Sequence, residues 1–188
     1  MQNPRGCSAV PQVIVGLNAV GSLDTMTHAI FLSGPIGAGK TTLGRAVAGK
    51  MGAAFLDGDD FADHSRPWFA SSLSTSQRIA NAALGALQAG RVAVVAYPLR
   101  RTNYVYFRRC MTDAGHRLIV VTLRASVASI LAATRGRQFD AGERGRIAKM
   151  IEEGYADRPF SDLIVDTDAG GFDETVETLM VRLKPLLA

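Results

Sequence analysis

The sequence contains little cysteine and no long apolar run. Only two of its 188 residues are cysteines, Cys7 and Cys110, and their separation matches no metal-ligand spacing. A reduced, cytoplasmic protein is therefore the default expectation. No apolar segment approaches the roughly 20 residues that a membrane-spanning helix needs, so no membrane association is expected.

The chain also lacks a basic run with interleaved aromatic residues, a pattern typical of nucleic-acid-binding segments. A nucleic-acid partner is therefore not expected, although 21 Lys and Arg outnumber 17 Asp and Glu and the net charge is +4. This excess fits an ordinary solvated surface, or a protein that handles small anions, because arginine suits phosphate and carboxylate recognition. With 47% hydrophobic residues, the chain can form one domain with a substantial core.

A complete phosphate-binding motif follows the first apolar segment. Residues 34–41 read GPIGAGKT and match the pattern G-x-x-x-x-G-K-[ST], between the strand and helix patterns that this motif requires. The backbone amides of such a loop bind phosphate oxygens, the lysine neutralises the β- and γ-phosphates, and the following hydroxyl binds Mg²⁺. The expected nucleotide-binding residues are Gly34, Pro35, Ile36, Gly37, Ala38, Gly39, Lys40, Thr41 and Thr42.

Strand and helix patterns alternate from this motif to the end of the chain. The predicted strands are 28–33, 53–56, 91–96, 117–123 and 163–165, and the predicted helices are 40–51, 74–88, 103–114, 126–134, 146–153 and 173–187. Residues 91–96 are apolar on both faces, as in the interior strand of a parallel sheet. We therefore predict an α/β fold with a doubly wound, five-stranded parallel sheet and helices on both faces.

The first 27 residues do not show the pattern of a folded element. Proline and glycine interrupt them repeatedly, and they lack the basic start and long apolar centre of a signal peptide. Two interpretations stay open: an extension that packs on the domain, or translation that begins at Met26. The expected domain is therefore residues 28–188.

Charged residues follow two of the predicted strands, where ligands of parallel sheets bind. Asp57 and Asp59 follow the second strand and should lie on the same side of the extended chain. Asp57 could hold a water on Mg²⁺, and Asp59 could accept the proton of an attacking hydroxyl; an acidic turn that caps a helix is the alternative. Arg100 and Arg101 follow the third strand and could bind an acidic acceptor or be surface charges.

The segment 135–145 is polar and rich in Arg and Gly. Such a segment between two helices is typical of a mobile lid that closes on ATP. In that interpretation Arg135 and Arg137 stabilise the transferring phosphoryl group and act as catalytic residues together with Lys40 and Asp59. A solvated linker is the alternative.

The phosphate loop, followed by Phe55-Leu56-Asp57-Gly58-Asp59, resembles the small P-loop metabolite kinases of the nucleoside-monophosphate-kinase-like fold, among them gluconate, adenylylsulfate and shikimate kinases. The local pattern is most similar to gluconate kinase in three further segments, which are Arg66-Pro67-Trp68-Phe69, Leu99-Arg100-Arg101 and Arg135-Gly136-Arg137-Gln138-Phe139. The H-P-x-x-N segment of that family is absent between Asp60 and Arg66.

The resemblance implies ATP as phosphoryl donor, Mg²⁺ as cofactor and an ordered lid closure. It implies transfer to a hydroxyl of a small anionic metabolite, with a sugar acid such as gluconate as the first expectation and adenylylsulfate, shikimate or a nucleoside monophosphate as alternatives. A regulatory NTPase without an acceptor is an alternative of another class. Mg²⁺ is expected at Thr41 and Asp57, and the adenine near Asp166 and Thr167. The expected acceptor residues are Asp57, Asp59, Arg66, Arg100 and Arg101. A monomer or homodimer is expected.

Overall fold

The computed structural model describes residues 27–63, 65, 68–132, 136 and 138–188, and the side chains of residues 68–70 are not described. Three residues with a predicted role, Arg66, Arg135 and Arg137, therefore lie outside the described residues, as do the first 26 residues.

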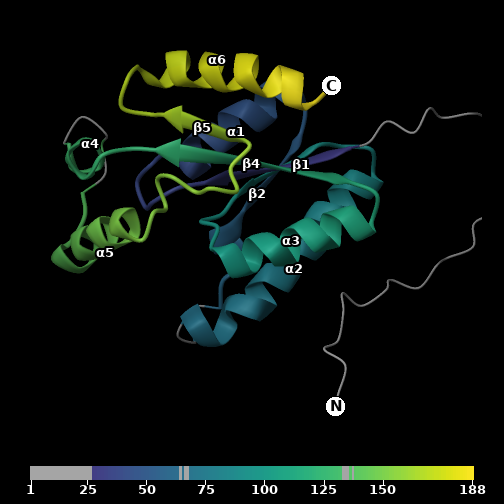
Figure 1. Ribbon diagram of the computed structural model, residues 1–188, viewed down its shortest axis with the longest axis horizontal. Helices are drawn as coiled ribbons and strands as arrows, with labels where there is room; N and C mark the ends of the chain where they lie inside the picture. The colour runs from purple at the N-terminus through teal and green to yellow at the C-terminus, as the bar shows by residue number, and fades with distance from the viewer. Residues whose placement is uncertain (1–26, 64, 66–67, 133–135, 137) are drawn as a thin grey trace, which may run out of the picture.

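One parallel sheet organises the molecule (Figure 1). Its strands are β1 (His28–Ser33), β2 (Ala54–Asp57), β3 (Ala93–Ala96), β4 (Arg117–Arg124) and β5 (Leu163–Asp166), in the spatial order β2-β3-β1-β4-β5. The central strand β1 pairs with β3 through Leu32 opposite Ala96, and with β4 through Leu32 opposite Val121. The doubly wound, five-stranded parallel sheet predicted from the sequence is thus confirmed.

The helices cover both faces of this sheet. They are α1 (Lys40–Met51), α2 (Trp68–Gln88), α3 (Arg101–Asp113), α4 (Val127–Leu131), α5 (Ala141–Glu152) and α6 (Phe172–Leu183), with short turns η1 (Gly58–Phe61) and η3 (Lys184–Leu186). Helices α1 and α6 lie on one face, α2 and α3 lie on the other, and α4 and α5 lie beyond the carboxyl ends of β4 and β5 (Figure 1). None of the described helices is long and apolar enough to cross a bilayer.

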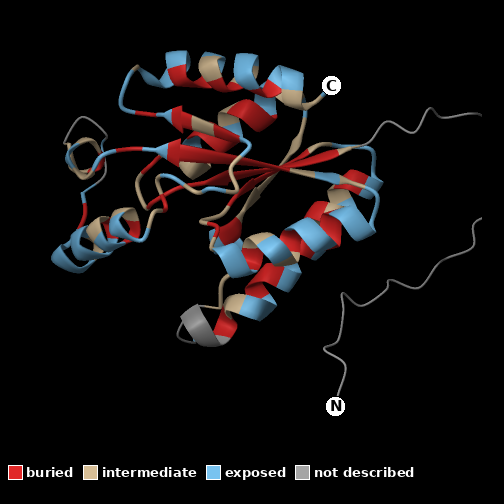
Figure 2. Cartoon of the chain, in the orientation of Figure 1, coloured by how far each residue is buried: buried red, intermediate tan, exposed pale blue. Residues whose placement is uncertain are grey.

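Alternation along β1 divides the core into two layers. Ile30 and Leu32 belong to a cluster with Val47 of α1 and Leu179 of α6, whereas Phe31 packs on the other face, with its ring centroid 4.7 Å from that of Phe107 in α3. Because side chains of a strand alternate between faces, one short apolar strand supplies both layers. Strands β1 and β3 are correspondingly buried along their whole length, whereas the edge strand β2 is only partly buried (Figure 2).

Two helices begin five or six residues earlier than predicted, whereas the other helix starts agree within two residues. Helix α2 begins at residue 68 instead of 74, because the serine-rich segment buries one face, with Ser71 and Thr75 each 5% exposed. Helix α5 begins at residue 141 instead of 146, because the Asp140 carboxylate accepts a hydrogen bond from the Glu143 amide (2.8 Å) and the Glu143 carboxylate accepts one from the Asp140 amide (3.2 Å). The second half of the segment predicted as a lid, 141–145, is therefore helical.

Other ends differ by a few residues. Helices α4 and α6 end at residues 131 and 183, short of the predicted 134 and 187, and β3 begins at residue 93 instead of 91. Strand β2 includes Asp57, one residue beyond its predicted end.

Candidate active site

The phosphate loop lies between β1 and α1, and its glycines are required by their surroundings. Gly34 has a φ of 139°, and a Cβ there would lie 2.5 Å from the carbonyl oxygen of Leu123. Gly37 has a φ of 79°, and a Cβ there would lie 2.5 Å from the side chain of Ile130 in α4. At these two positions the backbone therefore follows a path that only glycine adopts easily, and no side chain projects from them.

The start of α1 suits an anion. Gly39 caps the helix in the left-handed conformation without a side-chain hydrogen bond, so no side chain competes for the first amides. The Lys40 ammonium group donates to the carbonyl oxygens of Gly34 (3.2 Å) and Pro35 (2.8 Å) and so lies across the loop. Thr41 is half-buried and Thr42 is exposed at the same helix start. These donors fit the phosphates of a nucleotide, with Thr41 as the residue that could hold Mg²⁺.

The two predicted acidic residues have different surroundings. The Asp57 carboxylate accepts a hydrogen bond from the amide of Asp59 (3.2 Å), which caps η1, and its other oxygen lies 4.0 Å from the Arg45 guanidinium. Asp59 is exposed and lines a cavity. The turn between them depends on Gly58, which is buried and whose Cβ would overlap the ring of Tyr97.

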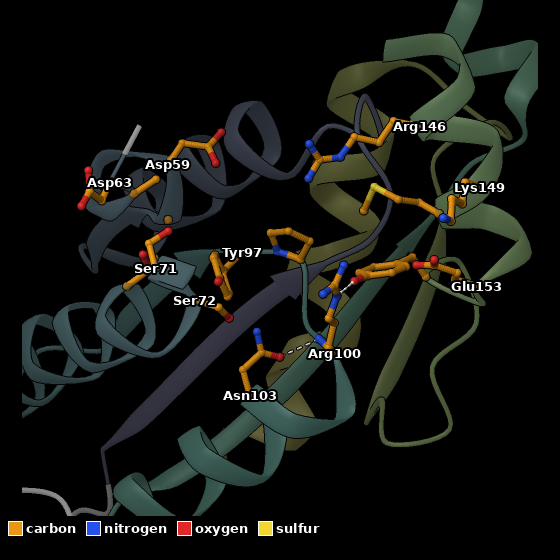
Figure 3. A pocket seen from close by; sticks show the side chains of 16 residues that line it. Asp59, Asp63, Ser71, Ser72, Tyr97, Arg100, Asn103, Arg146, Lys149 and Glu153 are labelled. Carbon is orange, nitrogen blue, oxygen red and sulfur yellow. Dashed lines mark hydrogen bonds between the residues drawn. The ribbon is translucent and has the colours of Figure 1, made fainter. Parts of the chain in front are cut away.

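The cavity that Asp59 lines has a volume of about 590 Å³ (Figure 3). Its walls come from η1, the first turns of α2, the segment after β3, α5 and the residues after α5. The lining residues are Gly58, Asp59, Ala62, Asp63, Ser71, Ser72, Thr75, Tyr97, Pro98, Arg100, Asn103, Arg146, Lys149, Met150, Glu153 and Tyr155. Pockets of a few hundred cubic ångströms with a few convergent polar groups are typical of small-molecule sites.

Arg100 is positioned by neighbours inside this cavity. Its backbone amide donates to the side-chain oxygen of Asn103 (2.6 Å), and its Nε donates to the hydroxyl of Tyr155 (2.5 Å). Tyr155 is only 3% exposed, and the Arg158 guanidinium lies 3.9 Å from its ring centroid. Arg101, the other arginine of the predicted pair, is exposed on α3 and does not line the cavity.

Two backbone amides after β3 donate hydrogen bonds that join this cavity to the end of β1, directly before the phosphate loop. The amide of Tyr97 donates to the Leu32 carbonyl (3.1 Å), and the amide of Leu99 donates to the buried Ser33 hydroxyl (2.9 Å), next to Gly34. Burial raises the pKa of the Tyr97 phenol, and hydrogen bonds with Ser76 and Asn103 oppose that rise. The cavity and the loop therefore share one edge of the sheet.

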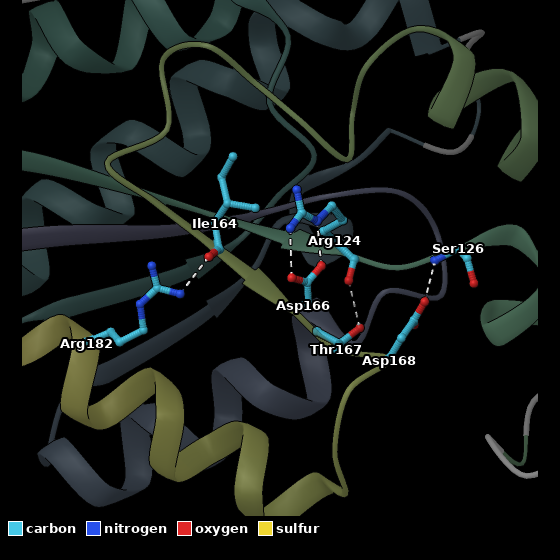
Figure 4. Close-up of polar contacts among 7 residues, drawn as sticks. All are labelled: Arg124, Ser126, Ile164, Asp166, Thr167, Asp168 and Arg182. Atoms are coloured by element: carbon cyan, nitrogen blue, oxygen red, sulfur yellow. Dashed lines mark hydrogen bonds and ion pairs between the residues drawn. The ribbon is translucent and has the colours of Figure 1, made fainter.

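Asp166 and Thr167, which were predicted to lie near the adenine, are at the carboxyl end of β5, next to Arg124 at the end of β4 (Figure 4). The Asp166 carboxylate accepts two hydrogen bonds from the Arg124 guanidinium, at 2.5 and 2.7 Å, and this hydrogen bonding to Arg124 holds the pKa of Asp166 below its usual value. The Thr167 hydroxyl donates to the Arg124 carbonyl (3.3 Å), and the Ser126 amide donates to Asp168 (2.8 Å). Asp166 thus forms an ion pair with Arg124.

Several cavity residues were not predicted from the sequence. The sequence analysis assigned no role to Arg146 and Lys149, although their separation of three places them on one face of a helix. The hydroxyls of Ser71 and Thr75 lie four residues apart, which also indicates a shared helical face. No local pattern indicated Tyr155, because its contact with Arg100 joins residues 55 apart in the sequence. Among the described residues, no group of three or more His, Cys, Asp or Glu side chains could hold a metal ion by itself.

Comparisons with known proteins agree with this geometry. A family model described as "ATPase family associated with various cellular activities (AAA)" matches residues 30–90, which contain the phosphate loop. No curated protein matches the sequence significantly.

Solved structures give a broader match. A gluconokinase from Sinorhizobium meliloti 1021 has a TM-score of 0.64 at 19% identity, over 86% of this chain and 94% of that one. An APS kinase of Mycobacterium tuberculosis, in complex with AMPPNP and APS, has a TM-score of 0.63 at 17% identity, over 85% and 98%. A shikimate kinase from Acinetobacter baumannii, in complex with shikimate, has a TM-score of 0.57 at 22% identity, over 87% and 97%.

These identities are low, so the likeness concerns the fold. The chain has the P-loop NTPase fold of the nucleoside-monophosphate-kinase-like type, and the resemblance to small P-loop kinases seen in the sequence is confirmed at that level.

Proposed function

We propose that this protein is a kinase that transfers the γ-phosphoryl group of MgATP to a hydroxyl of a small anionic metabolite. One observation carries the proposal: the cavity lined by Asp59 and Arg100 lies at the same edge of the sheet as the phosphate loop. The segment after β3, which forms part of the cavity wall, is hydrogen-bonded to the end of β1, the strand that leads into the loop. A donor cradle and a polar cavity at one sheet edge are what phosphoryl transfer to a second substrate needs.

The phosphate side of the proposed site consists of the loop 34–42. Its amides and Lys40 bind and neutralise the phosphates, while Thr41, and Asp57 through a water, hold Mg²⁺. When bound, MgATP supplies the phosphoryl group and the metal that polarises it. Asp166 and Thr167 lie near the adenine. One kinase of similar fold, the APS kinase, has been solved in complex with AMPPNP, which supports this assignment.

The acceptor side is the cavity. The acceptor hydroxyl attacks the γ-phosphorus, the bond from that phosphorus to the bridging oxygen breaks, and Asp59 accepts the hydroxyl proton. Arg66 and Arg100 bind the anionic acceptor, whereas Arg101 lies outside the cavity and takes no part in the proposed acceptor site. Arg135 and Arg137 stabilise the transferring group from a lid in 135–145. A sugar acid such as gluconate is the first candidate because a gluconokinase shares the fold, and adenylylsulfate and shikimate follow for the same reason. The proposed setting is cytoplasmic, with a monomer or homodimer.

An acceptor screen tests this proposal. The chain is incubated with MgATP and, in turn, sugar acids, adenylylsulfate, shikimate and nucleoside monophosphates, and ADP release is measured. We expect release that depends on one acceptor and disappears in Lys40→Ala, because the ammonium group is the mobile charge of the loop. The absence of acceptor-dependent release over the whole panel would count against a kinase.

A second candidate is an ATPase without an acceptor. The match of residues 30–90 to a family of ATPases favours it. ADP release at the same rate with and without every acceptor would support this candidate.

A further inference from the structure

The charged side chains of the cavity are divided between its two sides. Arg146, Lys149 and Glu153 come from α5 and the residue after it, and Arg100 stands at the start of α3 beside them (Figure 3). Asp59 lies across the cavity from them, together with Asp63 and the serines at the start of α2. A ligand in this cavity therefore meets mainly positive charge at one end and carboxylates and hydroxyls at the other.

Arg146 and Lys149 are both exposed on the surface of α5, and what distinguishes them from other surface cations is their position beside the cavity. They share a face of α5, and the intervening Ile147 is fully buried while the neighbouring Met150 is 7% exposed, which anchors this helix. Both cations line the cavity. Within the part of the chain that the structure describes, neither forms an ion pair with a carboxylate.

Arg100 contributes a cation that is already oriented. The Tyr155 hydroxyl accepts a hydrogen bond from its Nε, and the ring of Tyr155 is held under the guanidinium of Arg158. Fixing an arginine before the ligand arrives lowers the entropy lost on binding. This wall of the cavity contains three cations, Arg100, Arg146 and Lys149, and one carboxylate, that of Glu153. Its net charge is therefore positive, which suits a carboxylate or a phosphate group of a ligand.

We propose that Arg100, Arg146 and Lys149 together bind the anionic group of the acceptor, and that the acceptor presents its reactive hydroxyl at the opposite end, beside Asp59. The inference rests on the proposed kinase function. It assigns Arg146 and Lys149 as specificity-determining residues and defines the acceptor as a hydroxy compound whose charge lies remote from the phosphorylated hydroxyl.

The test compares each anionic acceptor with its uncharged counterpart in the ADP-release assay. The pairs are gluconate with glucitol, shikimate with its methyl ester, and a hexose phosphate with the free hexose. The variants are Lys149→Gln and Arg146→Gln. Lys184→Gln and Arg91→Gln are matched controls, since both side chains are exposed and neither lines the cavity.

We expect the anionic member of at least one pair to be used and its counterpart to be used poorly. Each cavity variant should raise KM for that anion about tenfold, the lower range for a lost charge-assisted hydrogen bond, with KM for ATP unchanged. If the carboxylate of a pair is the preferred acceptor, the cavity binds a carboxylate; if the hexose phosphate is preferred, it binds a phosphate. Equal use of charged and uncharged acceptors, an unchanged KM in both variants, or a rise in KM for ATP instead would overturn the inference while leaving a kinase. Release with no acceptor dependence at all would overturn both.

Discussion

Replacing Gly58 by alanine tests the packing that places Asp59 in the cavity. The added Cβ would overlap the Tyr97 ring and lie 2.9 Å from the carbonyl oxygen of Ala96, so the backbone between β2 and η1 has to move. Overpacking of this kind costs about 1 to 3 kcal/mol. For a domain of this size that lowers Tm by roughly 2 to 12 °C.

The same change should reduce turnover more than stability alone explains. A displacement of about 1 Å in a group that positions a reacting atom can cost about 100-fold in rate. Thermal unfolding and ADP release would be measured on the same preparation, below the transition of the variant.

Gly49→Ala is the matched control, because no atom lies within 4 Å of its Cβ position in α1. It should be neutral or stabilise the protein by about 0.5 to 1 kcal/mol, as expected for alanine in a helix. If Gly58→Ala and Gly49→Ala had the same Tm and the same turnover, the packing of Tyr97 against Gly58 would not be what orients Asp59.

Three further predictions concern single side chains. Asp59→Asn should lower kcat on the order of 10² to 10⁴ with KM for ATP nearly unchanged, and full turnover would exclude Asp59 as the base. Tyr155→Phe, which removes the acceptor of the Arg100 Nε hydrogen bond, should raise KM for the acceptor while kcat and KM for ATP stay constant; an unchanged KM would mean that Tyr155 does not position Arg100. Burial and the charge of Arg117 lower the pKa of His28, so the unfolded chain binds its proton first and stability should fall as pH drops below about 6.5. His28→Leu should flatten the dependence of Tm on pH, and an unchanged slope would contradict that origin.

The fold could be predicted because its signals are local. The phosphate-loop motif requires a strand before it and a helix after it, and the alternation of apolar segments then sets the parallel sheet. The start of α5 was missed although Asp140 and Glu143 form a capping box that a sequence pattern contains. The start of α2 was missed for a different reason, because buried serines such as Ser71 resemble a polar loop in the sequence.

The candidate site could be predicted in part. The loop and Asp59 were identified because short motifs at strand ends specify them. The hydrogen bond of Arg100 to Tyr155, and the approach of Lys149 to the same cavity, depend on where the start of α3 and the helix α5 lie in the folded chain, which no spacing in the sequence encodes. Arg100 and Arg101 could not be distinguished in the sequence, yet in the structure Arg100 lines the cavity and Arg101 is exposed outside it.

The most direct test of the central claim follows the phosphoryl group itself. ATP labelled at its γ-phosphate is incubated with Mg²⁺, the acceptor found in the screen, and either the natural chain or Lys40→Ala. The account predicts that the label appears on the acceptor with the natural chain, one acceptor phosphate for each ADP, and that Lys40→Ala transfers almost none. Label released only as inorganic phosphate, or equal transfer by both proteins, would contradict it.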